Sequence, residues 1–312
     1  MTLLYSDPRF LDHDTHRGHP ERAERLRQVS AHLDAIGLPA RCITPQWPPA
    51  TRERIERIHR SAYVNAVEDL AARGGGRPDP DTVVSPASFD VARLAAGAAC
   101  DAVDRVLAGE DRTAFCLVRP PGHHAMPDRA MGFCLFNNVA VAVRAAIDEH
   151  GLDRLLIVDW DVHHGNGTQD IFYADGRVGF LSIHRWPFYP GSGAADETGT
   201  GDGLGATRNL PIEFGTPRDA YRDKFRSELE KLAAHIKPQL VLVSAGFDSH
   251  REDPIGSLGL EVEDFAELTK CVVDVANVHA GGRVVSLLEG GYNPKRLAEC
   301  VAEHLEGLLA AK

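Results

Sequence analysis

One stretch constrains the possible folds more than any other: residues 155–167, which read LLIVDWDVHHGNG. Its first four residues are apolar, and such a run predicts a strand buried on both faces, as in a parallel sheet. The change to carboxylates and imidazoles marks the point where this strand leaves the core. Because side chains alternate along a strand, Asp159, Asp161 and His163 are expected on one face.

Two interpretations of this polar end are open. The three side chains can bind a metal ion, since buried carboxylates are unfavourable unless a cation satisfies them. Alternatively, they belong to a capped loop in which each side chain bonds to the backbone. The metal site is favoured because two acids and an imidazole share one face.

The composition is that of an ordinary globular protein with a large core, since 43% of the 312 residues are hydrophobic and 25% are charged. The net charge of -11 argues against nonspecific binding to nucleic acid or to an anionic membrane. No apolar run approaches the roughly 18 residues of a membrane span, and the N-terminus does not resemble a signal peptide. The six scattered cysteines include no Cys-x-x-Cys pair and indicate buried thiols. We therefore expect a cytoplasmic protein that binds neither nucleic acid nor membrane.

Strand and helix patterns alternate along the chain. Apolar runs predict strands at residues 3–6, 113–118, 155–158, 178–184, 240–247 and 284–288. Helical spacing predicts helices at residues 21–38, 51–73, 88–107, 218–236 and 296–309, and another that begins at Asn137 or Asn138. Residues 74–80, rich in glycine and proline, predict an irregular loop. The alternation predicts one α/β domain, residues 1–312, around a mostly parallel sheet.

Polar residues at the ends of the strands are expected to meet, because open parallel sheets bind ligands beyond the carboxyl ends of their strands. Four predicted strands end near such residues: His123 and His124, Asp161 and His163, Asp248, and Tyr292. A metal between O, N and O ligands, with two imidazoles and a phenol beside it, fits hydrolysis by a metal-activated water. Three further histidines, His13, His16 and His19, share one loop and could bind a metal, but surface and capping roles are favoured because no second ligand type is close.

Five blocks of the sequence resemble the signature motifs of the zinc-dependent histone deacetylase family. Their residues are those typical of its class II branch and of the bacterial histone deacetylase-like amidohydrolases. The blocks are RPPGHHA (119–125), GFC (132–134), VDWDVHHGNGTQ (158–169), SAGFD (244–248) and LEGGYN (288–293). They occur in the family's order and cover nearly the whole chain. The resemblance implies a single-domain, three-layer α/β/α arginase/deacetylase fold with a mostly parallel, eight-stranded sheet. It also implies an amidohydrolase that removes acetyl or other short acyl groups from lysine side chains.

The resemblance assigns a metal centre. Asp161, His163 and Asp248 match the zinc ligands, and the open fourth position holds the water and the substrate carbonyl. Tyr292 matches the phenol that donates a hydrogen bond to the oxyanion, and one such donor is worth about 3 kcal/mol of transition-state stabilisation. Some branches of the family carry histidine there and are poor deacetylases, so tyrosine favours an active enzyme.

The same resemblance assigns the groups that move protons. His123 and His124 match the two imidazoles that activate the water and protonate the leaving amine. Which imidazole performs which step stays open, because such a pair titrates as a unit. Asp159 and Asn166 match their hydrogen-bond partners, and asparagine in place of the aspartate of some relatives implies a less basic His124.

The substrate channel leaves two substrate classes open. Phe133 and Tyr189 match the aromatic walls that grip a lysine stem. Polyamine-selective relatives carry a glutamate directly after an Asp-Pro pair at the rim, whereas Ile255 occupies that position here, which favours acyl-lysine. Glu252 and Asp253 lie nearby and could replace that glutamate. An acetylpolyamine amidohydrolase therefore remains the alternative.

Two structural potassium sites are also implied by the resemblance. The inner site would be formed by Asp159, Asp161, His163, Ser182 and Ile183. The outer site would be formed, mainly through carbonyl groups, by Phe172, Asp175 and Val178.

Two other function classes are disfavoured. A two-manganese ureohydrolase needs an acid two residues after the histidine of the Asp-x-His motif, and Gly165 stands there. An inactive acyl-amine-binding protein would be indicated by loss of the phenol or of a metal ligand, and none is lost. The expected partner is thus an acyl-lysine protein or peptide, or an acetylated small amine. The natural substrate, the acyl length and the oligomeric state stay open.

Overall fold

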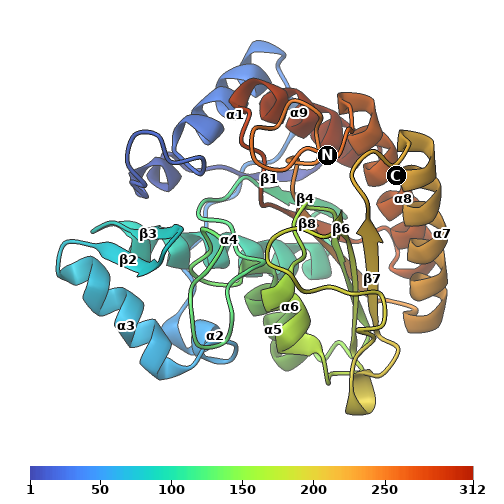
Figure 1. The fold of residues 1–312 in the computed structure, drawn as a ribbon, viewed down its shortest axis with the longest axis horizontal. Helices are drawn as coiled ribbons and strands as arrows, with labels where there is room; N and C mark the ends of the chain where they lie inside the picture. Colours follow the sequence, from blue (N-terminus) through green and yellow to red (C-terminus); the bar gives the residue numbers. More distant parts are fainter. Residues whose placement is uncertain (312) are drawn as a thin grey trace.

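A seven-stranded sheet forms the centre of residues 1–311, the part of the chain that this computed structural model describes (Figure 1). The strand order is β1 (Leu3–Tyr5), β4 (Thr113–Cys116), β9 (Val284–Leu288), β8 (Leu240–Ala245), β5 (Leu155–Asp159), β6 (Val178–Arg185) and β7 (Thr207–Ile212). Each neighbouring pair in this sheet is parallel. The expectation of a mostly parallel sheet is confirmed, whereas the expected count of eight strands is too high by one for the described residues.

The remaining two strands form a separate antiparallel pair, β2 (Gly76–Asp79) and β3 (Thr82–Val84). Strand β2 lies in the stretch predicted as an irregular loop. Its sequence, GRPD, is partly exposed and lacks any apolar alternation. A central strand of a parallel sheet must be apolar on both faces, so this segment cannot join the main sheet.

Helices cover both faces of the sheet and give three layers (Figure 1). One face is covered by α4 (Ser88–Ala108), α5 (Asn138–His150) and α6 (Asn166–Phe172), with α2 (Arg52–Glu56) and α3 (Ser61–Ala72) packed on them. The other face is covered by α7 (Arg218–Ile236), α8 (Val262–His279) and α9 (Pro294–Ala310), with α1 (Glu24–Ala35) packed on α9. Among the described helices, none combines the length and the apolar character that crossing a membrane requires.

Tertiary contacts explain where the helices differ from the prediction. The single helix expected at 51–73 is divided into α2 and α3. Thr51 caps the first through Arg54 N (3.2 Å), and the chain then turns because Arg60 N donates to the carbonyl of Pro127 (2.7 Å). The helix expected from residue 21 begins at Glu24, since Glu21 is buried beside Arg119. Asn137 is the N-cap of α5 and accepts a hydrogen bond from Ala140 N (3.0 Å).

The central strands bring the predicted site residues to one edge of the sheet. Strand β5 is buried along its whole length, and burial of each aliphatic side chain is worth about 1.5–3 kcal/mol. In the parallel register Asp159 lies opposite Ser244 of β8, and Ala245 lies opposite Leu288 of β9. The carboxyl ends of β5, β8 and β9 therefore open onto the same region.

Candidate active site

The three predicted metal ligands lie together in the core. Asp161, His163 and Asp248 are buried, and their potential ligand atoms all lie within 4.8 Å of one another. His163 Nδ1 is 3.0 Å from Asp161 Oδ1 and 3.2 Å from Asp248 Oδ2. Strand β5 ends at Asp159, so Asp161 and His163 lie in the turn that follows and not on one face of the strand. The residues meet as expected, although by a different local geometry.

Backbone amides fix the two carboxylates. Asp161 Oδ1 accepts a hydrogen bond from His163 N (2.9 Å) and Oδ2 accepts one from Gly290 N (2.8 Å). Asp248 Oδ1 accepts one from Val162 N (2.9 Å). Gly290 has to be glycine, because a Cβ there would lie 2.2 Å from Asp248 Oδ2 and 2.5 Å from Asp161 Oδ2. The turn after β9 thus closes directly over the carboxylates.

The residues present fit a zinc ion. Within the 311 described residues, Asp248 Oδ2 is buried and has no hydrogen-bond donor in suitable geometry. Burial, together with the neighbouring Asp161, raises the pKa of Asp248 to about 7. Burial lowers the pKa of His163, but Asp161 and Asp248 outweigh this effect and raise it to about 9. Carboxylate oxygen and imidazole nitrogen are both zinc ligands, three protein ligands are typical of a catalytic zinc site, and a cation would relieve the unsatisfied oxygen.

The two neighbouring imidazoles have different partners. His123 Nδ1 lies 2.9 Å from Asp159 Oδ2, whereas His124 Nδ1 lies 2.7 Å from Asn166 Oδ1. The ring centroids are 4.0 Å apart. Burial lowers the pKa of His123, but the carboxylates of Asp159 and Asp161 more than compensate and raise it to about 10. Burial and the adjacent His123 lower the pKa of His124 well below its usual value. One imidazole is therefore disposed to be charged and the other neutral.

Aromatic rings surround this centre. The ring of Tyr292 lies 5.7 Å from that of Phe133, edge to face, and the ring of Tyr189 lies 5.2 Å from that of His124. Tyr189 and Ile255 are each 38% exposed, which places both at the boundary with solvent. Phe188, which received no individual role from the sequence, stacks its ring on His163 at 5.3 Å. Its position directly before Tyr189 was the available signal.

A second set of buried charges supports the site and was not assigned a role from the sequence. Glu289 Oε2 accepts hydrogen bonds from Gly122 N (2.7 Å) and His123 N (3.2 Å). Arg25 Nε donates to the carbonyl of Gly291 (2.6 Å), and its guanidinium lies 5.0 Å from the ring of Tyr292. A charged residue directly after a buried strand, as Glu289 follows β9, needs partners, and this rule could have identified it.

Fully buried Glu21 links this set to the N-terminal loop. It pairs with Arg119 (2.5 Å) and Arg25 (3.1 Å), and both guanidinium groups are also buried. Burial alone would raise the pKa of Glu21, but Arg119 and Arg25 lower it well below its usual value. One carboxylate and two guanidinium groups thus form a buried charge cluster, in which backbone carbonyl groups also accept hydrogen bonds from both guanidinium groups.

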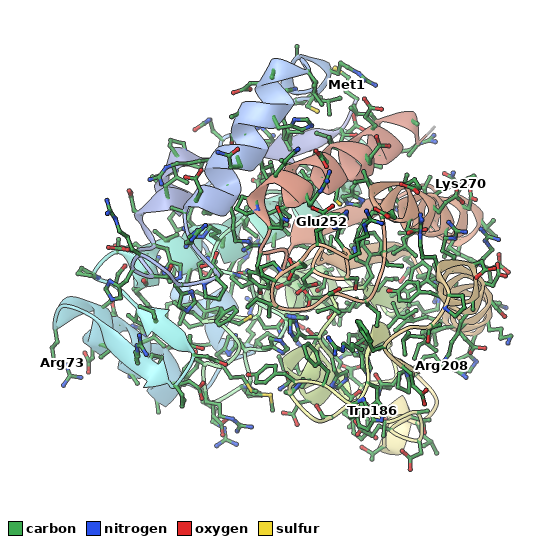
Figure 2. The ribbon with its side chains drawn as sticks, turned by 45° about the horizontal axis from the view of Figure 1, so that its top comes forward. Met1, Arg73, Trp186, Arg208, Glu252 and Lys270 are labelled. Carbon is green, nitrogen blue, oxygen red and sulfur yellow. The ribbon has the colours of Figure 1, made fainter. Side chains whose placement is uncertain are left out.

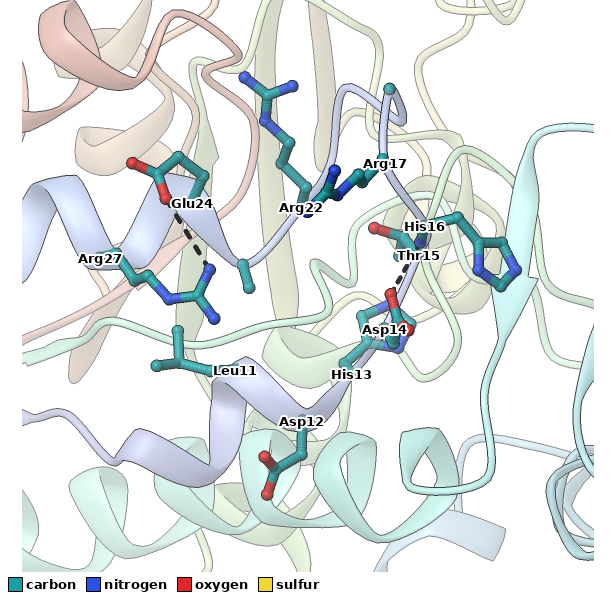
Figure 3. Close-up of a pocket in the computed structure, with 12 residues that line it drawn as sticks. Leu11, Asp12, His13, Asp14, Thr15, His16, Arg17, Arg22, Glu24 and Arg27 are labelled. Atoms are coloured by element: carbon teal, nitrogen blue, oxygen red, sulfur yellow. Dashed lines mark hydrogen bonds and ion pairs between the residues drawn. The ribbon is translucent and has the colours of Figure 1, made fainter.

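The histidine-rich loop differs from its predicted surface role. His13 is buried, lies 2.7 Å from Ser88 Oγ through Nδ1, and has a pKa lowered to about 4 by burial. The ring of His19 lies 4.8 Å from that of Phe133. His16 is exposed and, together with His13, lines a separate pocket of about 660 Å³ (Figure 3). The surface assignment is therefore wrong for His13, because the loop folds inward against α4.

The residues of the implied potassium sites lie on β5, β6 and α6, or in the turns beside them. Ser182 is paired with Asp159 in the sheet, and its hydroxyl lies 2.9 Å from His184 Nδ1. The carboxylate of Asp175 is bound by Arg177 (2.6 Å) and lies 3.6 Å from Arg144. An ion at the outer site would therefore rely on carbonyl groups, and both sites stay predictions.

The chain is similar to known proteins in both sequence and fold. The sequence profile of the histone deacetylase domain matches residues 19–308. The chain is 41% identical to the histone deacetylase-like amidohydrolase of Pseudomonas aeruginosa over 94% of this chain and 78% of that protein. It is 43% identical to the polyamine deacetylase HDAC10 of Homo sapiens over 93% of this chain and 44% of that protein. The crystal structure of the HDA15 HD domain superposes with a TM-score of 0.94 at 37% identity, covering 99% of this chain and 89% of that one.

Proposed function

The chain belongs to the histone deacetylase family, and we propose that it is a zinc-dependent amidohydrolase that removes acetyl or other short acyl groups from lysine side chains. Its relatives include proteins named deacetylases and amidohydrolases, which act on amide bonds. The observation that carries the proposal is the meeting of Asp161, His163 and Asp248 beside two imidazoles and a phenol. These groups come from distant parts of the sequence, and together they provide the metal ligands, proton carriers and oxyanion donor that metal-assisted hydrolysis uses.

Asp161, His163 and Asp248 would hold the zinc. When bound, zinc supplies a Lewis acid that polarises the substrate carbonyl and lowers the pKa of a water molecule. The turn after β9 keeps both carboxylates in place through Gly290 N. Structural potassium ions at the sites described above are part of the same proposal.

The imidazoles hold and move the protons. In both His123 and His124 the Nδ1 atom is engaged by its partner, so the Nε2 atoms are the ones available for proton exchange. The carboxylate of Asp159 favours a charged His123, whereas burial and the adjacent His123 keep His124 neutral and able to accept a proton. The same pair can then return a proton to the leaving amine.

Tyr292 donates its phenolic hydrogen to the oxygen that becomes negatively charged as the amide is attacked. Its backbone N–H is held by Asp253 Oδ2 (2.6 Å). Replacing Tyr292 with Phe is expected to lower kcat about 100-fold, because one oxyanion donor is lost. Zinc content measured by elemental analysis should not change, and a variant with unaltered kcat would remove this role.

Two observations at the rim favour acyl-lysine over acetylpolyamine. Glu252 lies beside α9, where Arg296 binds its carboxylate at 2.9 Å (Figure 2). Asp253 points inward and accepts hydrogen bonds from the backbone N–H groups of Tyr292, Ile255 and Gly256. Both acids therefore already have partners among the described residues, which supports the proposal that neither takes the place of a rim glutamate binding a second ammonium group.

Acetylpolyamine remains a second candidate because of the 43% identity to a protein named polyamine deacetylase. The test is to assay acetyl-lysine peptides and acetylated polyamines side by side on zinc-loaded protein, with and without a chelator. We expect peptide cleavage that the chelator stops. Preferred turnover of the polyamine would favour the second candidate, and no turnover of either would contradict the proposed function.

A charge placed at the rim tests the specificity argument directly. Replacing Ile255 with Glu should raise activity on acetylpolyamine relative to peptide about fivefold, as expected for a partly exposed ion pair. The matched control is Ile255→Gln, which has a similar size and no charge. An equal ratio in the two variants would show that charge at this position does not select the substrate.

A further inference from the structure

Two methionines hold the side chain that orients His124. Asn166 Nδ2, at the start of α6, donates to Met126 Sδ at 3.2 Å and to Met131 Sδ at 3.3 Å. Its Oδ1 accepts from His124 Nδ1 at 2.7 Å. Met126 and Met131 lie in the short loop that follows the His123–His124 pair. The asparagine amide is thus held between two thioethers on one side and an imidazole on the other.

The chemistry of sulfur determines which way this amide faces. A thioether carries no hydrogen and can only accept a hydrogen bond. If the amide were turned over, Oδ1 would face two acceptors and both Nδ2 hydrogen bonds to sulfur would be lost. The two sulfur atoms therefore select the orientation in which Oδ1 faces the imidazole, and an oxygen in that position requires His124 to carry its hydrogen on Nδ1.

We propose that Met126 and Met131 are positioning residues which, through Asn166, fix the tautomer of His124 with hydrogen on Nδ1 and a free lone pair on Nε2. The inference rests on the proposed function, since it concerns the imidazole assigned to accept a proton. Without the sulfur atoms the amide could reverse and donate to Nδ1. The hydrogen would then move to Nε2, where it would block proton acceptance.

The test replaces both methionines with leucine, which nearly conserves volume and removes both acceptors. In zinc-loaded protein we expect kcat to fall about fivefold with little change in KM, in keeping with the loss of two weak hydrogen bonds. The same double substitution is then made in an Asn166→Asp background. A carboxylate presents oxygen on both sides, so no reversal is possible, and the methionine substitutions should change kcat less than twofold there.

A second measurement does not depend on turnover. Nitrogen NMR of zinc-loaded protein at about pH 8, well above the ordinary pKa of histidine, distinguishes the two tautomers of His124. The unaltered chain should show hydrogen on Nδ1, and the Met126→Leu, Met131→Leu variant should show a mixture. If the tautomer is unchanged in the variant, or if kcat falls equally in both backgrounds, the methionines act only by packing and the inference is wrong. A tautomer shift in a chain that hydrolyses no acyl-lysine would instead support the inference and refute the proposed function.

Discussion

Asp253 offers a quantitative test of how the site is held together. Its Oδ2 accepts from Tyr292 N at 2.6 Å, and its Oδ1 accepts from Ile255 N at 2.9 Å and Gly256 N at 3.0 Å. In an Asp253→Asn variant, the single amide oxygen should stay with the two donors of the rim loop. The amide NH2 then faces the N–H of Tyr292, whose hydrogen bond is lost. A hydrogen bond to a charged group contributes about 1.5–3 kcal/mol, and the free energy of unfolding should fall by that amount.

The Asp253→Asn substitution should lower kcat less than the Tyr292→Phe substitution does, because the phenol is displaced and not removed. The hydrogen bond from an oxyanion donor stabilises the transition state by about 3 kcal/mol. If displacement of Tyr292 removes about 1 kcal/mol of this stabilisation, kcat should fall about fivefold. Denaturant unfolding and peptide turnover of zinc-loaded protein measure the two effects. The control is Glu252→Gln, which removes an adjacent carboxylate from a surface ion pair with Arg296 and should leave the free energy of unfolding nearly unchanged. If Asp253→Asn behaves like this control in both assays, the positioning argument is wrong.

Two further predictions concern the metal and the buried charges. Replacing Asp248 with Ala should abolish zinc retention in elemental analysis, and a variant that keeps a full complement of zinc would refute the ligand assignment. Glu21→Gln should destabilise the fold by about 3–5 kcal/mol at neutral pH, because Arg25 and Arg119 then lose a buried partner. Since the pKa of Glu21 is lowered by folding, its stabilising effect is complete above its unfolded pKa near 4.5 and is lost as the pH falls below it. Lowering the pH from about 5 to about 3 should therefore reduce the free energy of unfolding of the Glu21→Gln variant less than that of the unaltered chain. Parallel plots of the free energy of unfolding against pH for the two proteins would contradict this account.

The parts of the fold that sequence could predict are those controlled by local pattern. Strand β5 begins with four consecutive apolar residues and β9 is apolar except for Ser286, and the polar residues that follow such runs are expected at the edge of a parallel sheet. The break between α2 and α3 depends instead on Arg60 N reaching the carbonyl of Pro127. No local pattern contains such a contact, because the partner comes from another part of the chain.

The site shows the same division. Asp161, His163 and Asp248 could be singled out because carboxylates and imidazoles after buried strands need an explanation. The local pattern predicts Glu21 as the beginning of a helix, because its partner Arg119 lies 98 residues away and leaves no local signal. Composition and periodicity depend only on residues that are neighbours in the sequence. A buried charge such as Glu21 depends on partners that the fold brings together from distant parts of the chain.

The strand order has a consequence for synthesis of the protein. Strand β9 lies between β4 and β8, yet it follows both of them by many residues in the chain. A nascent chain that has not reached β9 can assemble β1 with β4, and β5 to β8 with one another, but each part then exposes an unpaired edge. His123 and His124 follow β4, while Asp161 and Asp248 follow β5 and β8. The active site can therefore assemble only after β9 has been synthesised. Chains that end earlier expose two unpaired, aggregation-prone strand edges, which chaperones would have to cover.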